Sequence, residues 1–283
     1  MCRISASFLL LCTLLAAKTP DWDRAVDLYH RTQYKQSLDI LLPLAEKDAA
    51  TFDLIGQNYF MLGEYKKATE IFEKAVILEP RNAEYVHWLG RTYGRRAETG
   101  SPFTAPGYAS KARQMFEKAY TLDPTNQEAV NDLFDFYLQA PGFLGGGLNK
   151  AEALAKHIAS LDAAEGLYAQ AQLDDKRKEY DQAEQHLRRA ADLAPRQVGR
   201  VLDVAKYLSK RGRIKESEAM FEQAARMAPN NPKVMFERAN TYIKDQRNLN
   251  EARQLLERYL QSPLTPDDPP REHAEALLKK LGA

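Results

Sequence analysis

The residues that could carry out chemistry are few and scattered along the chain. No two of the five histidines are four residues apart, and no HExxH pattern occurs, so the histidines are not spaced as metal ligands. Cysteine occurs only as Cys2 and Cys12, which leaves the rest of the chain without a thiol nucleophile, a cysteine zinc site or a disulfide. No GxSxG motif marks a serine nucleophile. We therefore expect no enzymatic activity, no metal and no cofactor.

The stretch GFLGGGLNK (142–150) has the outline of a phosphate-binding loop but lacks its chemistry. Gly142 and Gly147 have the required separation, yet Leu148 stands where that loop needs a lysine, and no strand precedes it. Three consecutive glycines indicate a sharp turn instead. Asn149, followed three residues later by Glu152, is typical of a helix N-terminus. We interpret the segment as a turn that leads into a helix.

The overall charge argues against a nucleic-acid partner. Lys and Arg number 40, Asp and Glu number 39, and the formal net charge is +1. Proteins that bind nucleic acid usually carry a clear basic excess. Because 44% of the residues are hydrophobic, the chain has enough apolar side chains to build a core.

The first 17 residues, MCRISASFLLLCTLLAA, are typical of an export signal. Arg3 supplies the positive start, an uncharged stretch runs to Ala17, and charge resumes at Lys18. This stretch is shorter than the roughly 20 residues that a membrane-spanning helix needs. The sequence therefore predicts a signal peptide over residues 1–17, cleaved after Ala17.

We expect no lipid anchor at Cys12, because a bulky Leu11 precedes it where lipoprotein signals carry a small residue. No other apolar run approaches membrane length, so no membrane span is expected in the mature chain. The mature chain also lacks an Asn-x-Ser/Thr site, which favours a bacterial periplasm over a eukaryotic secretory route.

A fixed period of 34 residues organises the rest of the chain. YDQAEQHLRRAADLAP (180–195) and IKESEAMFEQAARMAP (214–229) align without a gap, and the same frame recurs at 63–80 and 111–124. Each segment places small residues where two antiparallel helices would touch. Each also ends in a proline, which stops a helix and opens the next turn.

This pattern closely resembles the tetratricopeptide repeat, a 34-residue helix–turn–helix unit. The resemblance implies an all-α solenoid, a right-handed superhelix of such units; the chain is also similar to exported bacterial tetratricopeptide proteins of uncharacterised role. A helix at 271–283, with Ala274, Leu277, Leu278 and Leu281 on one face, is expected to cap the solenoid within residues 266–283. Residues 18–265 divide into seven units: 18–48, 49–82, 83–126, 127–163, 164–197, 198–231 and 232–265.

The resemblance also implies a groove, because the first helices of such units line a concave face. A mixed polar and aromatic lining suits peptide recognition, in which rigid anchors alternate with hydrogen-bonding groups. Asp53 shares the repeat position of the predicted lining residues His87 and Asn131. The predicted lining, which would bind the partner, is Gln57, Phe60, His87, Arg91, Asn131, Asp135, Tyr168, Gln172, Lys206, Phe236 and Asn240.

Two consecutive units carry insertions rich in proline and glycine, about ten residues within 95–110 and about five within 139–150. We expect both to be turns, and to lie close together on one edge of the solenoid. They would form a second candidate binding edge. Alternatively, Phe103 and Phe143 only pack on each other to hold the two turns. The residues of this predicted edge are Arg95, Arg96, Phe103, Tyr108, Phe143 and Leu144.

These features together predict an exported scaffold that binds another protein or a peptide. One alternative is a small-ligand-binding component that serves a transporter. Another is an assembly factor for the envelope or the outer membrane. A deep pocket closed by the two insertions would favour a small ligand, whereas an open groove would favour a peptide.

Overall fold

The computed structural model describes residues 20–282, which form an all-α chain. Cys2, Cys12 and the predicted signal peptide (1–17) lie outside the described residues. None of the described helices is both long and apolar enough to cross a membrane. The helices are α1 (Pro20–His30), α2 (Tyr34–Leu41), α3 (Ala49–Met61), α4 (Tyr65–Leu78), α5 (Ala83–Thr99), α6 (Ala105–Leu122), α7 (Gln127–Gln139), the short 3₁₀ helix η1 (Gly142–Leu144), α8 (Leu148–Leu161), α9 (Ala163–Arg177), α10 (Tyr180–Leu193), α11 (Val198–Lys210), α12 (Ile214–Met227), α13 (Pro232–Lys244), α14 (Leu249–Gln261) and α15 (Arg271–Gly282).

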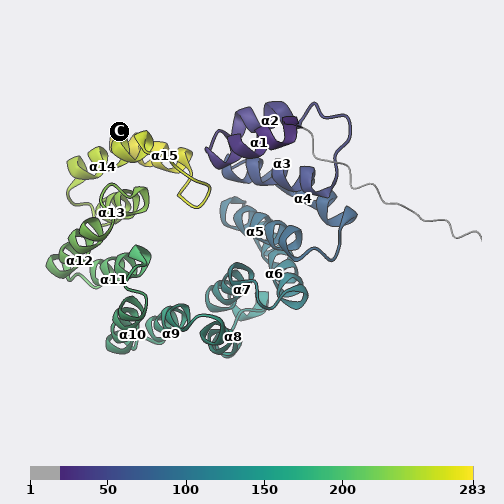
Figure 1. Cartoon of the computed structure of the whole chain (residues 1–283). Helices are drawn as coiled ribbons and strands as arrows, with labels where there is room; N and C mark the ends of the chain where they lie inside the picture. The colour runs from purple at the N-terminus through teal and green to yellow at the C-terminus, as the bar shows by residue number, and fades with distance from the viewer. Residues whose placement is uncertain (1–19, 283) are drawn as a thin grey trace, which may run out of the picture.

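Consecutive helices pack in pairs, from α1 with α2 to α13 with α14, and α15 packs on α14. The pairs stack side by side into a curved array that bends almost into a ring (Figure 1). The result is an all-α solenoid of helix pairs, as the sequence predicts.

Side-chain caps fix where the first helix of most units begins. Asp48, Asn82, Asn126, Asp162 and Asn231 each accept a hydrogen bond from a backbone N–H in the first turn of the helix that follows. These N–H groups have no partner within the helix, so a cap at each start stabilises it.

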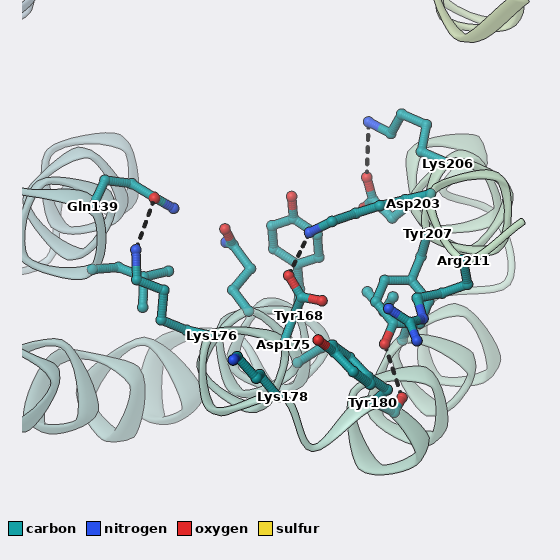
Figure 2. Close-up of a pocket in the computed structure, with 15 residues that line it drawn as sticks. Gln139, Tyr168, Asp175, Lys176, Lys178, Tyr180, Asp203, Lys206, Tyr207 and Arg211 are labelled. Atoms are coloured by element: carbon teal, nitrogen blue, oxygen red, sulfur yellow. Dashed lines mark hydrogen bonds and ion pairs between the residues drawn. The ribbon is translucent and has the colours of Figure 1, made fainter. Parts of the chain in front are cut away.

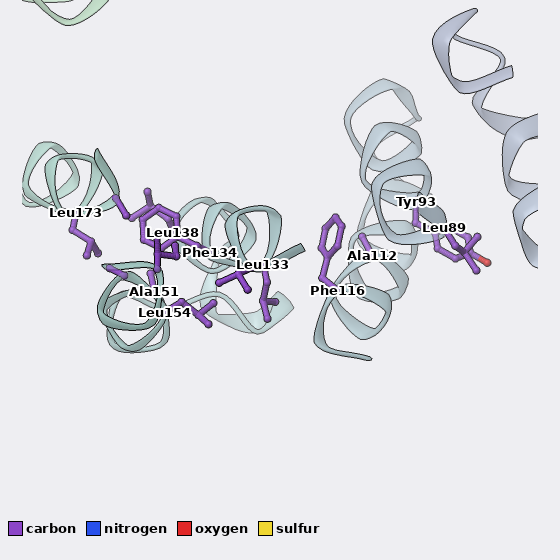
Figure 3. Packing of buried hydrophobic residues seen from close by; sticks show 14 of the residues in the cluster. Leu89, Tyr93, Ala112, Phe116, Leu133, Phe134, Leu138, Ala151, Leu154 and Leu173 are labelled. Atoms are coloured by element: carbon purple, nitrogen blue, oxygen red, sulfur yellow. The ribbon is translucent and has the colours of Figure 1, made fainter. Parts of the chain in front are cut away.

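Glycine on the first helix lets the aromatic ring of the second helix approach the backbone. A Cβ atom on Gly56 would lie 2.7 Å from the Phe72 ring, and one on Gly90 would lie equally close to the Phe116 ring. Phe116 belongs to the central hydrophobic cluster, together with Leu89 and side chains of the next unit (Figure 3). The close helix contacts expected from the small residues are therefore present.

Replacing Ala224 with leucine should overpack such a contact. Ala224 is fully buried between α12 and its neighbours, in the cluster that contains Phe221 and Val234. We expect a loss of about 1–3 kcal/mol in unfolding free energy, because the added atoms have no space. Urea denaturation measures this loss, and an unchanged midpoint would contradict the packing described here.

The two ends of the solenoid meet. The Arg271 guanidinium donates a hydrogen bond to Thr32 Oγ1 over 3.2 Å, and the same group also bonds the carbonyls of Leu260 and Ser262. The start of α15 thus reaches the turn that follows α1 (Figure 1). This contact closes the ring and bounds the concave face at both ends.

The first insertion differs from its prediction as a turn. Most of it lengthens two helices, because α5 continues to Thr99 and α6 begins at Ala105. Pro106 and Gly107 lie in the first turn of α6, where a proline removes no helical hydrogen bond.

The second insertion is a turn, as predicted. It contains η1 and Gly145, whose φ of 92° favours glycine. The prediction that Asn149 begins the next helix is wrong by two residues, because Gly147 is the N-cap of α8. The chain already turns into the helix at the glycines.

Candidate functional site: the concave groove

Three cavities lie along the concave face. The first cavity, of about 1060 Å³, lies between α1, α3, α5 and α7, and the loop before α15 closes one side of it. Tyr29, Gln57, Arg91 and Asn131 line it from the four helices, and Asp267 lines it from the loop. This cavity therefore exists because the ends of the solenoid meet.

The second cavity, of about 600 Å³, lies beside the two insertions. Arg95 borders it at the lengthened end of α5, and Leu144 borders it from the turn of the next unit. Phe60 and Asp135 line it from the concave helices α3 and α7. The two insertions therefore do approach each other, although about forty residues separate them in the chain.

The third cavity, of about 540 Å³, lies between α7, α9 and α11 (Figure 2). Tyr168, Tyr180 and Tyr207 supply aromatic surface, and Lys206 and Arg211 supply positive charge. Burial raises the pKa of Tyr168, so its hydroxyl stays protonated and can donate a hydrogen bond.

The three cavities adjoin one another along the concave face, since neighbouring cavities share lining residues. Arg91 and Asp132 line both the first and the second cavity. Gln139 and Gln172 line both the second and the third. The row of adjoining cavities, which we call the groove, therefore extends from α1 to α11.

Two of the predicted groove residues, Phe236 and Asn240, line none of the three cavities. Phe236 is 3% exposed, and its ring packs 5.2 Å from those of Tyr259 and His273. The prediction for Phe236 is therefore wrong, because α15 covers α13 where the groove would have continued. Asn240, also on α13, lines none of the three cavities. The structure places the other predicted residues in the lining: Gln57, Phe60, His87, Arg91, Asn131, Asp135, Tyr168, Gln172 and Lys206.

The predicted edge residues divide into three groups. Arg95 and Leu144 line the second cavity. The Arg96 guanidinium lies 4.0 Å above the Tyr108 ring and donates a hydrogen bond to its hydroxyl, so this pair stiffens the edge. Phe103 and Phe143 are 94% and 83% exposed, so they do not pack on each other to hold the turns.

A cluster around Arg91 fixes the boundary between the first and second cavities. His87 Nε2 lies 2.7 Å from Asp132 Oδ2, and the Arg91 Nε lies 3.5 Å from the same oxygen. The Arg91 guanidinium also lies 4.4 Å from the centre of the Trp88 ring. These contacts hold Arg91 rigid at the surface, as an anchor for a ligand requires. Sequence reasoning missed Asp132, although it follows the predicted Asn131.

Gln57, which lines the first cavity, bonds a buried carboxyl group of which only one oxygen has a hydrogen-bond partner. Asp53 is 7% exposed, Gln57 Nε2 donates a hydrogen bond to its Oδ2 over 2.7 Å, and its Oδ1 has no partner. Burial raises the pKa of Asp53 to about 8, and the nearby charge of Glu84 raises it further while the Gln57 hydrogen bond lowers it. The carboxyl group that Gln57 bonds is therefore largely protonated at neutral pH.

Among residues 20–282, no three His, Cys, Asp or Glu side chains are grouped so that they could hold a metal ion. The groove instead offers charged, hydrogen-bonding and aromatic side chains on rigid helices. These are features of a recognition surface.

Comparison with known proteins supports the repeat assignment. Residues 49–82 and 202–269 each match a model of the tetratricopeptide repeat. A tetratricopeptide repeat protein from Parabacteroides merdae is 15% identical, with 93% of this chain and 98% of that chain covered, at a TM-score of 0.58. A thermophilic tetratricopeptide repeat protein from Thermus thermophilus is 21% identical, with 66% of this chain and 97% of that chain covered, at a TM-score of 0.54. At these identities the likeness shows the fold alone. No curated protein matches the chain.

Proposed function

Because the chain is a tetratricopeptide repeat protein, we propose that it is a scaffold that binds a partner protein through an extended peptide in its concave groove. The observation that carries this proposal is the row of three adjoining cavities along the concave face. A small molecule would fill one cavity, whereas a peptide can contact all three in sequence.

The length of the groove suits a peptide of about twelve residues. From α3 to α11 it crosses five first helices, α3, α5, α7, α9 and α11. The axes of directly packed helices lie about 8–10 Å apart, which sets the shortest step between neighbouring first helices. Four such steps span about 32–40 Å, which an extended chain covers with about 10–12 residues at about 3.3 Å each. Polar groups along the groove would bond the peptide backbone, and Phe60 and Tyr168 would contact apolar side chains.

A second candidate function is a small-ligand-binding component that serves a transporter. The second cavity favours it, because its volume of about 600 Å³ is typical of a small-molecule site and both insertions border it. An assembly factor for the envelope or the outer membrane would be a scaffold of the first kind, with a partner in that machinery.

Selection of random twelve-residue peptides on the purified chain tests the proposal. We expect enriched peptides whose affinity falls about tenfold or more in Arg91→Glu and in Tyr168→Ala, since both residues line the groove. Ile77→Ala is the control, because Ile77 is exposed on α4 and lines none of the three cavities. Failure to enrich any peptide, or equal binding by all three variants, would contradict the proposal.

We also propose that the chain is exported and cleaved after Ala17. The support is the short uncharged stretch that ends where charge resumes at Lys18. Intact-mass measurement of the exported protein should give Lys18 as the first residue. A diacylglyceryl adduct at Cys12 would instead show a lipid-anchored protein.

A further inference from the structure

We propose that the groove orients its peptide by charge, with an acidic segment of the peptide in the third cavity and a basic segment in the first. This inference rests on the proposed function and adds the chemistry and direction of the bound peptide. It follows from how charged side chains are distributed, and from which of them already have a partner of opposite charge.

The third cavity is basic. Five cationic side chains and two carboxylates line it. Both carboxylates already form ion pairs with lining lysines. Lys210 Nζ lies 2.6 Å from Asp175 Oδ2. Lys206 Nζ lies 3.2 Å from Asp203 Oδ1. The remaining lining cations have no carboxylate partner within residues 20–282; they are Lys176, Lys178 and Arg211.

Two of these three cations, Arg211 and Lys176, are held at the cavity by neutral groups, which leave their charge uncompensated. The Arg211 guanidinium lies 3.6 Å from the centre of the Tyr180 ring, and Lys176 Nζ lies 3.4 Å from Gln139 Oε1 (Figure 2). Lys178 sits at a left-handed φ of 66°, in a turn where two other units place Gly63 and Gly212. Three like charges gathered in this way repel one another, and an anionic group bound between them would relieve that repulsion.

The first cavity has the opposite charge. Glu84, Glu128, Asp132 and Asp267 line it, and Arg91 is its only cationic side chain apart from two histidines. Asp132 lies within ion-pair distance of both His87 and Arg91, and Glu128 lies 3.7 Å from Arg91. Glu84 and Asp267 have no cationic partner within the described residues, so this end of the groove attracts a cation.

Between the two ends the charges are mixed. Arg91 and Arg95 face Glu98, Asp132 and Asp135 in the second cavity. The charge of the lining therefore changes sign along the groove. A peptide with one basic and one acidic end is attracted at both ends in one orientation, and it is repelled at both ends in the other. A uniformly anionic ligand, such as a nucleic acid, would be repelled by the first cavity.

The peptide selection tests this inference through the composition of the enriched sequences. We expect acidic residues to gather at one end and basic residues at the other, with the same polarity in all sequences. In a Lys178→Glu, Arg211→Glu double variant the acidic preference should disappear. In a Glu84→Lys, Glu128→Lys double variant the basic preference should disappear. Lys66→Glu, on the exposed side of α4, is the control and should keep both preferences.

Affinity measurements then give the size of the effect. A peptide selected on the unsubstituted chain should bind each double variant about tenfold more weakly at low salt, with a smaller difference at high salt. Enriched peptides without charge asymmetry, or double variants that keep both preferences, would overturn this inference while the proposed function stands. Failure to enrich any peptide would overturn the proposed function, and the inference with it.

Discussion

Replacing Asp53 with asparagine should stabilise the folded chain by about 2–4 kcal/mol at pH 8 and change its stability little at pH 4. An aspartate in the unfolded chain loses its proton near pH 4, whereas burial raises the pKa of Asp53 to about 8 in the folded chain. Between these pH values the unfolded state has released a proton that the folded state keeps. The unfolding free energy that Asp53 contributes therefore falls as the pH rises through this range. The loss is complete above the pKa that Asp53 has in the folded chain.

Asparagine has nearly the same shape and cannot ionise, so the variant should lack this loss. Urea denaturation at pH 4, 6 and 8 measures the unfolding free energy of the variant and of the unsubstituted chain. The variant should be the more stable of the two by an amount that grows with pH. Asp192→Asn, at an exposed position on α10, is the matched control and should show no widening gap. A gap for Asp53→Asn that stays constant from pH 4 to pH 8 would contradict the assignment.

Replacing Gly166 with alanine should destabilise the chain by about 2–3 kcal/mol, even though alanine favours helix formation. Gly166 lies in the first turns of α9, where it packs on Ala159 of α8. An added methyl group would overlap the Cα and Cβ atoms of Ala159. Backbone atoms cannot rotate away as a flexible side chain can, so α8 and α9 would have to move apart.

Gly94→Ala provides the opposite outcome. Gly94 lies within α5, and no atom would lie within 4 Å of an added Cβ atom. Alanine there should raise the unfolding free energy by about 0.5–1 kcal/mol, because it restricts the unfolded chain and favours the helix. The midpoints of both thermal and urea denaturation should therefore rise in Gly94→Ala and fall in Gly166→Ala. Equal shifts would show that the contact between α8 and α9 is not as close as described.

The repeated units could be predicted from the sequence because their signals are local. Small residues such as Ala190 and Ala224 recur with the period of the repeat, and Pro195 and Pro229 follow the helices that contain them. The first insertion differs from its prediction for an equally local reason. A stretch rich in proline and glycine favours a turn, yet a proline such as Pro106 is also favoured in the first turn of a helix.

The closure of the ring could not be predicted, because it depends on the curvature accumulated over all seven pairs of helices. The hydrogen bond between Arg271 and Thr32 joins residues 239 positions apart. The sequence predicts Phe236 in the groove for the same reason, since no local signal shows that α15 returns to cover it. The basic third cavity was also missed, because the sequence does not show that Asp175 pairs with Lys210 and leaves Lys178 without a carboxylate partner.

Mapping both ends of one bound peptide tests most directly whether the concave face is a single peptide-binding groove. A selected twelve-residue peptide is made in two forms, with a photoreactive benzophenone at the acidic end or at the basic end. Mass spectrometry then locates each cross-link on the unsubstituted chain. The acidic end should attach to α9 or α11, near Tyr168 and Arg211, and the basic end to α3 or α5, near Gln57 and Arg91. Attachment of both ends within one cavity, or to exposed positions of α4 or α12, would contradict a peptide that spans the groove.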